Sequence, residues 1–229
     1  MARLVFLVTI SLHVCLVLAL LVSEGLLVAP RNYLDSLERG EIADVQQLRG
    51  SLAAIELARG IRPLAADPDL MAARLQLWLG KTVAESESLQ TALVRLQDAQ
   101  AKRPSWGAPV SDQARLLIKQ GQWGKGGREA LEVSLKLGPH EYFLLRRYLT
   151  LGALYYRPES TSFRQQFVQH LRYALGVRYQ NDLVQLLVIH RLEEALSAAL
   201  LELEDSHPLK TVYQEQLRWM LSVRDAPSA

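Results

Sequence analysis

The feature that most restricts how this chain can fold is an uncharged apolar run near its N-terminus. From Leu4 to Val22 there are nineteen consecutive residues without a formal charge, and only three of them are polar. A helix of that length spans about 28 Å, close to the thickness of the hydrocarbon layer of a bilayer. The run therefore predicts a membrane-spanning helix at residues 4–22.

The residues that flank this run bear on two questions, namely whether the segment is cleaved and which way it crosses the membrane. Ser23 and Gly25 have the small-x-small spacing of a signal-peptide cleavage site, so removal of the segment stays an alternative to an uncleaved anchor. Arg3 precedes the run, and Glu24 is the first charge after it. The positive-inside rule then places the N-terminus in the cytoplasm. In a Gram-negative cell this predicts a single-pass inner-membrane protein whose C-terminal domain is periplasmic.

The remainder of the chain has the composition of a helical domain. It is rich in Leu, Ala, Gln, Glu and Arg, and no long stretch alternates apolar and polar residues as a strand does. The formal net charge is only +2, so the chain lacks the basic surface expected of a nucleic-acid-binding protein. The single cysteine, Cys15, excludes an intramolecular disulfide and a cysteine-based zinc site. We predict an all-α fold with no cofactor and no nucleic-acid partner.

A repeat is suggested by the prolines at positions 68, 104 and 139. They lie 36 and 35 residues apart, a period typical of helix–turn–helix repeats. The unit that ends at Pro104 matches the tetratricopeptide (TPR) pattern, in which small residues stand where paired helices cross closely. The matching residues are Leu79, Gly80, Ala92, Leu96, Ala99 and Pro104. The unit ending at Pro139 matches less well, and the one ending at Pro68 matches only at its proline.

These patterns predict a transmembrane helix, a TPR-like helical-repeat domain and a capping helical bundle. The predicted segments are an anchor at 1–29, a short exit linker at 30–35, TPR-like hairpins at 35–140, C-terminal capping helices at 141–224 and a tail at 225–229. Individual helices are expected at about 35–60, 68–80, 84–102, 109–120, 127–137, 141–157, 163–179, 183–204 and 208–223.

No motif predicts catalysis or metal binding. The glycine-rich stretch 121–128 lacks the spacing and the Ser or Thr of a phosphate-binding loop and follows a helix, so we interpret it as a turn. None of the five histidines has a second His or a Cys at ligand spacing, although His190 is expected on one helical face with Glu193 and Glu194. We predict a non-enzyme. The alternative is a sugar-processing enzyme whose acidic groups converge only in space, with Glu129, Glu132 and Glu141 as candidates.

Aromatic residues interleaved with arginines suggest a surface for a protein partner. Repeat proteins bind partners on concave faces, where aromatic and arginine side chains are the usual anchors. The candidate residues are Trp106, Trp123, Tyr142, Arg146 and Arg147. The alternative is that the aromatic rings are core residues, with the arginines covering the rim.

Four short segments in the middle of the chain form a pattern of their own: Arg103-Pro104-Ser105-Trp106, Lys119-Gln120-Gly121, Glu129-Ala130-Leu131 and Leu137-Gly138-Pro139-His140-Glu141. Together they resemble the VpsP family of bacterial exopolysaccharide-biosynthesis proteins. The resemblance covers about residues 100–180 well, and the chain departs from the family pattern at His140 and at Gly107-Ala108. It implies a membrane-anchored accessory or scaffold protein that binds a protein component of a polysaccharide synthesis or export machine, and it carries over no catalytic residue. The alternative is a TPR-type scaffold of another envelope assembly, for secretion, pilus formation or cytochrome maturation.

Overall fold

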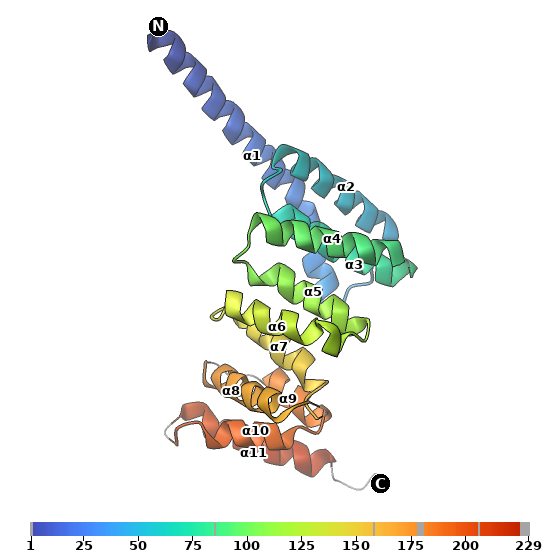
Figure 1. Cartoon of the computed structure of the whole chain (residues 1–229), viewed down its shortest axis with the longest axis vertical. Coiled ribbons are helices and arrows are strands. Elements are labelled where there is room, and N and C mark those ends of the chain that lie inside the picture. Colours follow the sequence, from blue (N-terminus) through green and yellow to red (C-terminus); the bar gives the residue numbers. More distant parts are fainter. Residues whose placement is uncertain (1, 85, 158, 178–180, 206, 225–229) are drawn as a thin grey trace. The chain divides into compact units, whose positions relative to one another are not determined.

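The computed structural model describes the chain except for residues 1, 85, 158, 178–180, 206 and 225–229, and the predicted tail therefore lies outside the described residues. Within the described residues the protein has eleven α-helices, one short 3-10 helix and no strand (Figure 1). The predicted all-α fold class is confirmed. The chain divides into two compact units, Met1–Leu116 and Leu117–Ala229. This division falls about 25 residues earlier than the predicted start of the capping helices at 141.

The first unit contains four complete helices and most of a fifth. They are α1 (Ala2–Glu38), α2 (Val45–Ile61), α3 (Asp67–Val83), α4 (Ser86–Lys102) and α5 (Gly107–Lys119), the last of which continues past the boundary between the units. The bounds of α3 to α5 lie within a few residues of the predicted ones. Pro68 stands in the first turn of α3, where proline is favoured because its missing N–H needs no partner.

A single helix joins the apolar N-terminal run to the core of the first unit. α1 continues without interruption through residues 30–35, so the predicted exit linker is wrong. Pro30 lies inside this helix and cannot donate a hydrogen bond to the preceding turn, a defect that costs roughly 3 kcal/mol in a free helix. Leu27, Leu34 and Leu37 are buried against α2 and α3, and this burial offsets the cost.

The two ends of the α1–α2 hairpin are each held by specific polar contacts. At the turn, the backbone N–H of Asp44 donates to the Tyr33 hydroxyl at 2.8 Å, and that hydroxyl lies 3.2 Å from the backbone oxygen of Asp44. The Asp44 carboxylate caps α2 by accepting from the N–H of Gln47 at 2.7 Å. At the other end, Arg62 pairs with Glu24 of α1. The two helices are therefore antiparallel, and α2 returns along α1 (Figure 1).

Small residues allow α3 and α4 to pack closely. Gly80 of α3 is buried, and Ala92 and Ala99 of α4 have no exposed surface. Leu96 and Ala99 pack with Leu70 and Ala73 of α3 and with Ala108 at the start of α5. Of the positions that matched the repeat pattern, Gly80, Ala92, Leu96 and Ala99 are buried in this helical pair, whereas Leu79 packs with residues of α1 and α2 and Pro104 is exposed in the turn after α4.

The second unit begins with the end of α5 and contains six further α-helices. After a 3-10 helix, η1 (Trp123–Lys125), come α6 (Gly127–Leu137), α7 (Tyr142–Ala153), α8 (Thr161–Val177), α9 (Asn181–Ile189), α10 (Glu193–Leu201) and α11 (Pro208–Arg224). The glycine-rich stretch forms the turn around η1, as its sequence predicted. α6 has the predicted bounds, whereas α7 ends four residues before the predicted position.

The helix predicted at 183–204 is in fact two helices, α9 and α10. Arg191 adopts a left-handed conformation with φ of 55°, and the N–H of Leu192 donates to the Leu187 carbonyl at 2.8 Å, so the chain turns between them. The expected single helical face of His190, Glu193 and Glu194 therefore does not exist, because His190 follows α9 and the two glutamates begin α10.

Candidate functional site

The exposure of α1 changes abruptly at Ser23. No side chain from Phe6 to Val22 is buried, and the apolar ones in this stretch are mostly more than half exposed. Beyond it, burial follows a four-three spacing at residues 23, 27, 30, 34 and 37, which places one stripe of the helix in the core. One helix, α1, is long and apolar enough to cross a membrane, and only 6% of its most apolar eighteen-residue window is buried. A core helix would be mostly buried, so the exposure of this stretch fits contact with lipid.

The boundary between the exposed and buried parts of α1 carries a polar cluster. The Ser23 hydroxyl is buried and has no hydrogen-bond partner among the described residues. The next residue, Glu24, pairs with Arg62 from the turn after α2 and lies 3.7 Å from the Arg31 guanidinium. The first charge after the apolar run is therefore tied to the folded unit and is not in a free linker.

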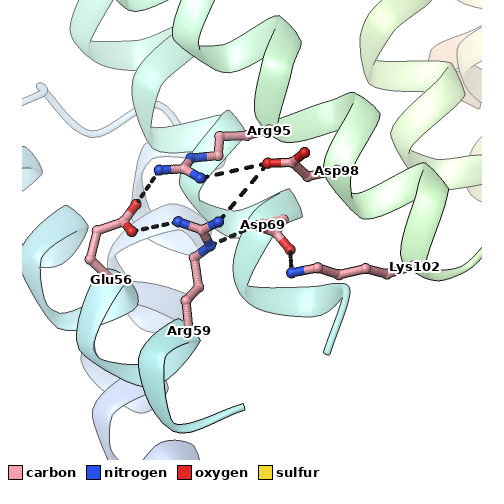
Figure 2. A network of polar contacts seen from close by, with 6 residues as sticks. All are labelled: Glu56, Arg59, Asp69, Arg95, Asp98 and Lys102. Carbon is pink, nitrogen blue, oxygen red and sulfur yellow. Dashed lines mark hydrogen bonds and ion pairs between the residues drawn. The ribbon is translucent and has the colours of Figure 1, made fainter. Parts of the chain in front are cut away.

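A buried carboxylate fixes α3 to its neighbours in the first unit. The Asp69 side chain has no exposed surface, and its two oxygens accept from Arg59 Nε at 2.6 Å and from Lys102 Nζ at 2.5 Å (Figure 2). Arg59 belongs to α2 and Lys102 is the last residue of α4. One carboxylate in the first turn of α3 thus joins three helices, and its charge also suits the positive end of the α3 dipole.

Further ion pairs extend this network over the surface of the unit. Glu56 pairs with Arg59 at 2.5 Å and with Arg95 at 2.9 Å. Asp98 lies 3.6 Å from Arg95 and 4.0 Å from Arg59, so positive and negative groups alternate (Figure 2). Each of these charged groups has a partner of opposite charge, and the ion pairs join α2 to α4. Arg74 and the fully buried Asp112, 2.7 Å apart, join α3 to α5 in the same way.

In the second unit, a groove of about 670 Å³ lies between α8 and α10. Its apolar lining residues are Val168, Ala198 and Tyr156, of which Val168 and Tyr156 are buried. Its polar lining residues are Thr161, Arg164, Gln165, Gln169, Glu194 and Glu202. Gln165 and Gln169 are one helical turn apart on α8, Glu194 and Ala198 have the same spacing on α10, and Glu202 directly follows that helix. Polar residues from both sides of the groove therefore border a small apolar area.

A second feature of this unit is an aromatic cluster around Trp123. Its indole ring stacks on Tyr155 with centroids 4.3 Å apart and meets Phe163 edge-on at 5.5 Å. The indole N–H donates to the carboxylate of Glu159, which also pairs with Arg128 at 3.0 Å. The hydrogen bond from Trp123 holds the pKa of Glu159 below its usual value, and contacts with Ser160 and Arg128 lower it further against the effect of desolvation.

The five residues predicted to bind a partner are divided between the two units. Trp106 belongs to the first unit, where it is half-buried beneath the Arg103 guanidinium, and the other four belong to the second unit. Trp123 is only 7% exposed, which leaves little of its ring for a partner. Tyr142 is half-buried, Arg146 is exposed and pairs with Asp182, and Arg147 lies over the Phe143 ring. The groove between α8 and α10 was missed, because its residues come from two helices and form no motif.

The three glutamates proposed for the enzyme alternative do not converge. Glu129 lies in the first turn of α6 and Glu141 follows its end, so about 12 Å of helix separates Glu129 from the last residue of α6. Glu132 is engaged by Arg128 at 3.5 Å. Among the residues whose side chains are described, no group of three or more His, Cys, Asp or Glu could hold a metal ion.

Comparisons with protein families, with curated proteins and with solved structures find nothing that matches this chain. The function is therefore inferred from the geometry described above.

Proposed function

We propose that this protein is a membrane-anchored, non-catalytic helical adaptor that holds a partner protein at the membrane surface. The observation that carries the proposal is the division of α1 into an exposed apolar half and a half that belongs to the core of the first unit. A helix shared in this way connects the membrane to the folded domain without a flexible linker. The domain's position at the bilayer is then part of its function, as expected of a scaffold.

The TPR-like character of the domain is part of this proposal. It is supported by the close packing of α3 with α4 at Gly80 and Ala92, and by the burial of Leu96 and Ala99 at the contact with α5. A repeat protein presents grooves between successive helices, and such grooves bind extended or helical peptide segments.

We place the partner segment in the groove between α8 and α10. Val168 and Ala198 give the groove an apolar lining that accepts apolar side chains, and the carboxamides of Gln165 and Gln169 can both donate to and accept from a peptide backbone. Arg164 and Glu194 add charges of opposite sign, which favour a polypeptide of mixed charge over a uniformly charged polymer.

The biological setting follows from the resemblance to the VpsP family, with surface polysaccharide synthesis or export as the process and the periplasm as the site of the domain. The topology can be tested by fusing the C-terminus to a reporter enzyme that is active only outside the cytoplasm. Activity of the fusion supports the periplasmic placement, and an inactive but stable fusion contradicts it.

The partner proposal is tested by photo-crosslinking in cells that carry the full chain. A photoreactive amino acid is placed at Gln165, which lines the groove, and at Gln166, an exposed residue of the same type on another face of α8. We expect a crosslinked component of the polysaccharide machine from position 165 and not from 166. We also expect deletion of the gene to lower polysaccharide output. Equal crosslinking at both positions would reject the groove, and a crosslinked secretion or pilus protein would favour another envelope assembly.

A further inference from the structure

The turn between α2 and α3 lies at the level where α1 becomes apolar and exposed. Arg62, the first residue after α2, pairs with Glu24, and Glu24 is two residues beyond the last exposed apolar residue of the run, Val22. Two helical residues correspond to about 3 Å along the axis. If the exposed half of α1 spans a bilayer, the α2–α3 turn therefore meets the surface of that bilayer.

This turn presents an apolar side chain to solvent. Leu64 is 87% exposed, and Pro63 beside it is also exposed. A single exposed leucine on a soluble protein needs no explanation. Here Leu64 lies next to the end of the apolar stretch of α1, where lipid would be its partner. Transfer of a leucine side chain from water into the interfacial layer of lipid is favourable.

The turn between α4 and α5 adjoins the first one. Gly60, Pro63 and Lys102 line one pocket, which brings the end of α4 beside the end of α2. Arg103 is exposed and lies over the ring of Trp106, with its guanidinium carbon 4.9 Å from the ring centroid. Tryptophan and arginine are typical of membrane interfaces, where the ring lies among headgroups and the cation faces phosphate.

The charge of the two turns matches an anionic lipid surface. Residues 61–66 and 102–106 contain Arg62, Lys102 and Arg103 and no acidic residue. The α1–α2 turn, at the opposite end of the hairpin, contains Arg39 together with the acidic residues Glu41 and Asp44. Arg62 and Lys102 are paired with Glu24 and Asp69, which leaves Arg103 as the cation of these turns that can face a lipid headgroup.

We infer that the α2–α3 and α4–α5 turns form a second membrane contact, in which Leu64 enters the interface of the bilayer that α1 spans and Arg103 faces anionic headgroups. This inference rests on the proposed anchoring by α1. Its consequence is that the first unit lies against the bilayer at a fixed angle. A single spanning helix leaves the unit free to rotate about the axis of α1, and the second contact prevents that rotation.

The test uses the full chain in vesicles of phosphatidylethanolamine and phosphatidylglycerol, with an environment-sensitive fluorophore on one cysteine at a time. The native Cys15 reports on the span. Leu64→Cys and Ile42→Cys, each combined with Cys15→Ala, report on the two ends of the hairpin. Ile42 is the matched control, because it is 95% exposed and lies in the turn at the opposite end of the α1–α2 hairpin. Lipids that carry a bromine or nitroxide quencher in the acyl chain report depth.

We expect strong quenching and a blue shift at position 15, weaker quenching and a smaller blue shift at 64, and the emission of a water-exposed probe at 42. Quenching at 64 should fall when phosphatidylcholine replaces the anionic lipid or when Arg103→Gln is added. If position 15 is quenched but 64 behaves like 42, the second contact is wrong while the anchor stands, and Leu64 is left exposed for a protein. If position 15 is not quenched, both the anchor and the second contact are wrong. If quenching at 64 changes neither with the lipid charge nor with Arg103→Gln, the contact between Arg103 and the headgroups is wrong.

Discussion

Arg62 and Glu24 form an ion pair across 38 positions of sequence, between the turn after α2 and the first charged residue beyond the apolar run of α1. The pair marks the point where one helix passes from an exposed apolar stretch into the core of a folded unit. Both side chains keep some contact with solvent, so the pair contributes little free energy by itself. The pair matters because it holds the α2–α3 turn beside the end of the apolar stretch of α1.

The core half of α1 should be essential for the fold of the first unit. Leu27→Ala removes a side chain that is 1% exposed, and we expect it to cost about 2–5 kcal/mol because it leaves a cavity. Val28→Ala, at a neighbouring residue that is 51% exposed, should cost far less. Hydrogen exchange of the α2 and α3 amides in detergent measures both effects. Equal loss of protection in the two variants would mean that α1 does not pack as described.

The buried carboxylate of Asp69 should be more sensitive than its neighbour on the same helix. Asp69→Asn removes the counter-charge that Arg59 and Lys102 share, and we expect it to cost about 1.5–3 kcal/mol, the range for hydrogen bonds to charged groups, because both cations keep some contact with solvent. Asp67→Asn is the control, since Asp67 is exposed in the same first turn. Urea unfolding followed by helix content should show a lower midpoint for the first variant only. A similar midpoint for both would indicate that the network in Figure 2 does not hold the helices together.

Close packing around Gly127 predicts an asymmetry between two glycines of one turn. A Cβ at Gly127 would stand 2.8 Å from Ile118 Cγ1 and 3.1 Å from the backbone oxygen of Gln122, whereas a Cβ at Gly124 meets nothing within 4 Å. Gly127→Ala should therefore lower the free energy of unfolding by about 1–3 kcal/mol through overpacking. Gly124→Ala should have little effect. Thermal unfolding of the two variants distinguishes them, and a neutral Gly127→Ala would show that Ile118 moves aside at little cost.

The Trp123–Glu159 contact predicts a pH dependence. Because the pKa of Glu159 is lowered in the folded state, its carboxylate adds stability above its ordinary value of 4.5, and this contribution is lost as the pH falls through the lowered pKa. Glu159→Gln should be less stable than the wild type at pH 7, and the difference should shrink towards pH 3. Glu129→Gln, at an exposed glutamate, is the control. A difference that stays constant across this range would contradict the contact.

The sequence predicted well those helices whose ends are marked by glycine or proline. Glycines and prolines bracket α6, and its bounds were found correctly. Pro30 gave a false signal of a linker, since core packing on both sides of it keeps the helix intact. The turn at Arg191 has a left-handed residue without a glycine, so periodicity alone could not divide α9 from α10.

The candidate site was harder to predict because its parts are distant in sequence. The partners of Asp69 lie 10 and 33 positions away, and the α8–α10 groove joins residues that are about 30 positions apart. Of the predicted partner-binding residues, Trp123 is instead held in an aromatic core, and interleaved aromatic and basic residues cannot distinguish these two cases. The partner-binding roles of Trp106, Tyr142, Arg146 and Arg147 stay predictions.

The central claim, that α1 is an uncleaved anchor, is tested most directly by the intact mass of the protein purified from cells. We predict that the chain fractionates with membranes after alkaline carbonate washing and that its mass includes the segment Phe6–Val22. Cleavage after Gly25 would instead give a chain that begins at Leu26, lacks Ser23 and Glu24, and appears in the soluble fraction. That result would contradict the anchor and the membrane-held adaptor together.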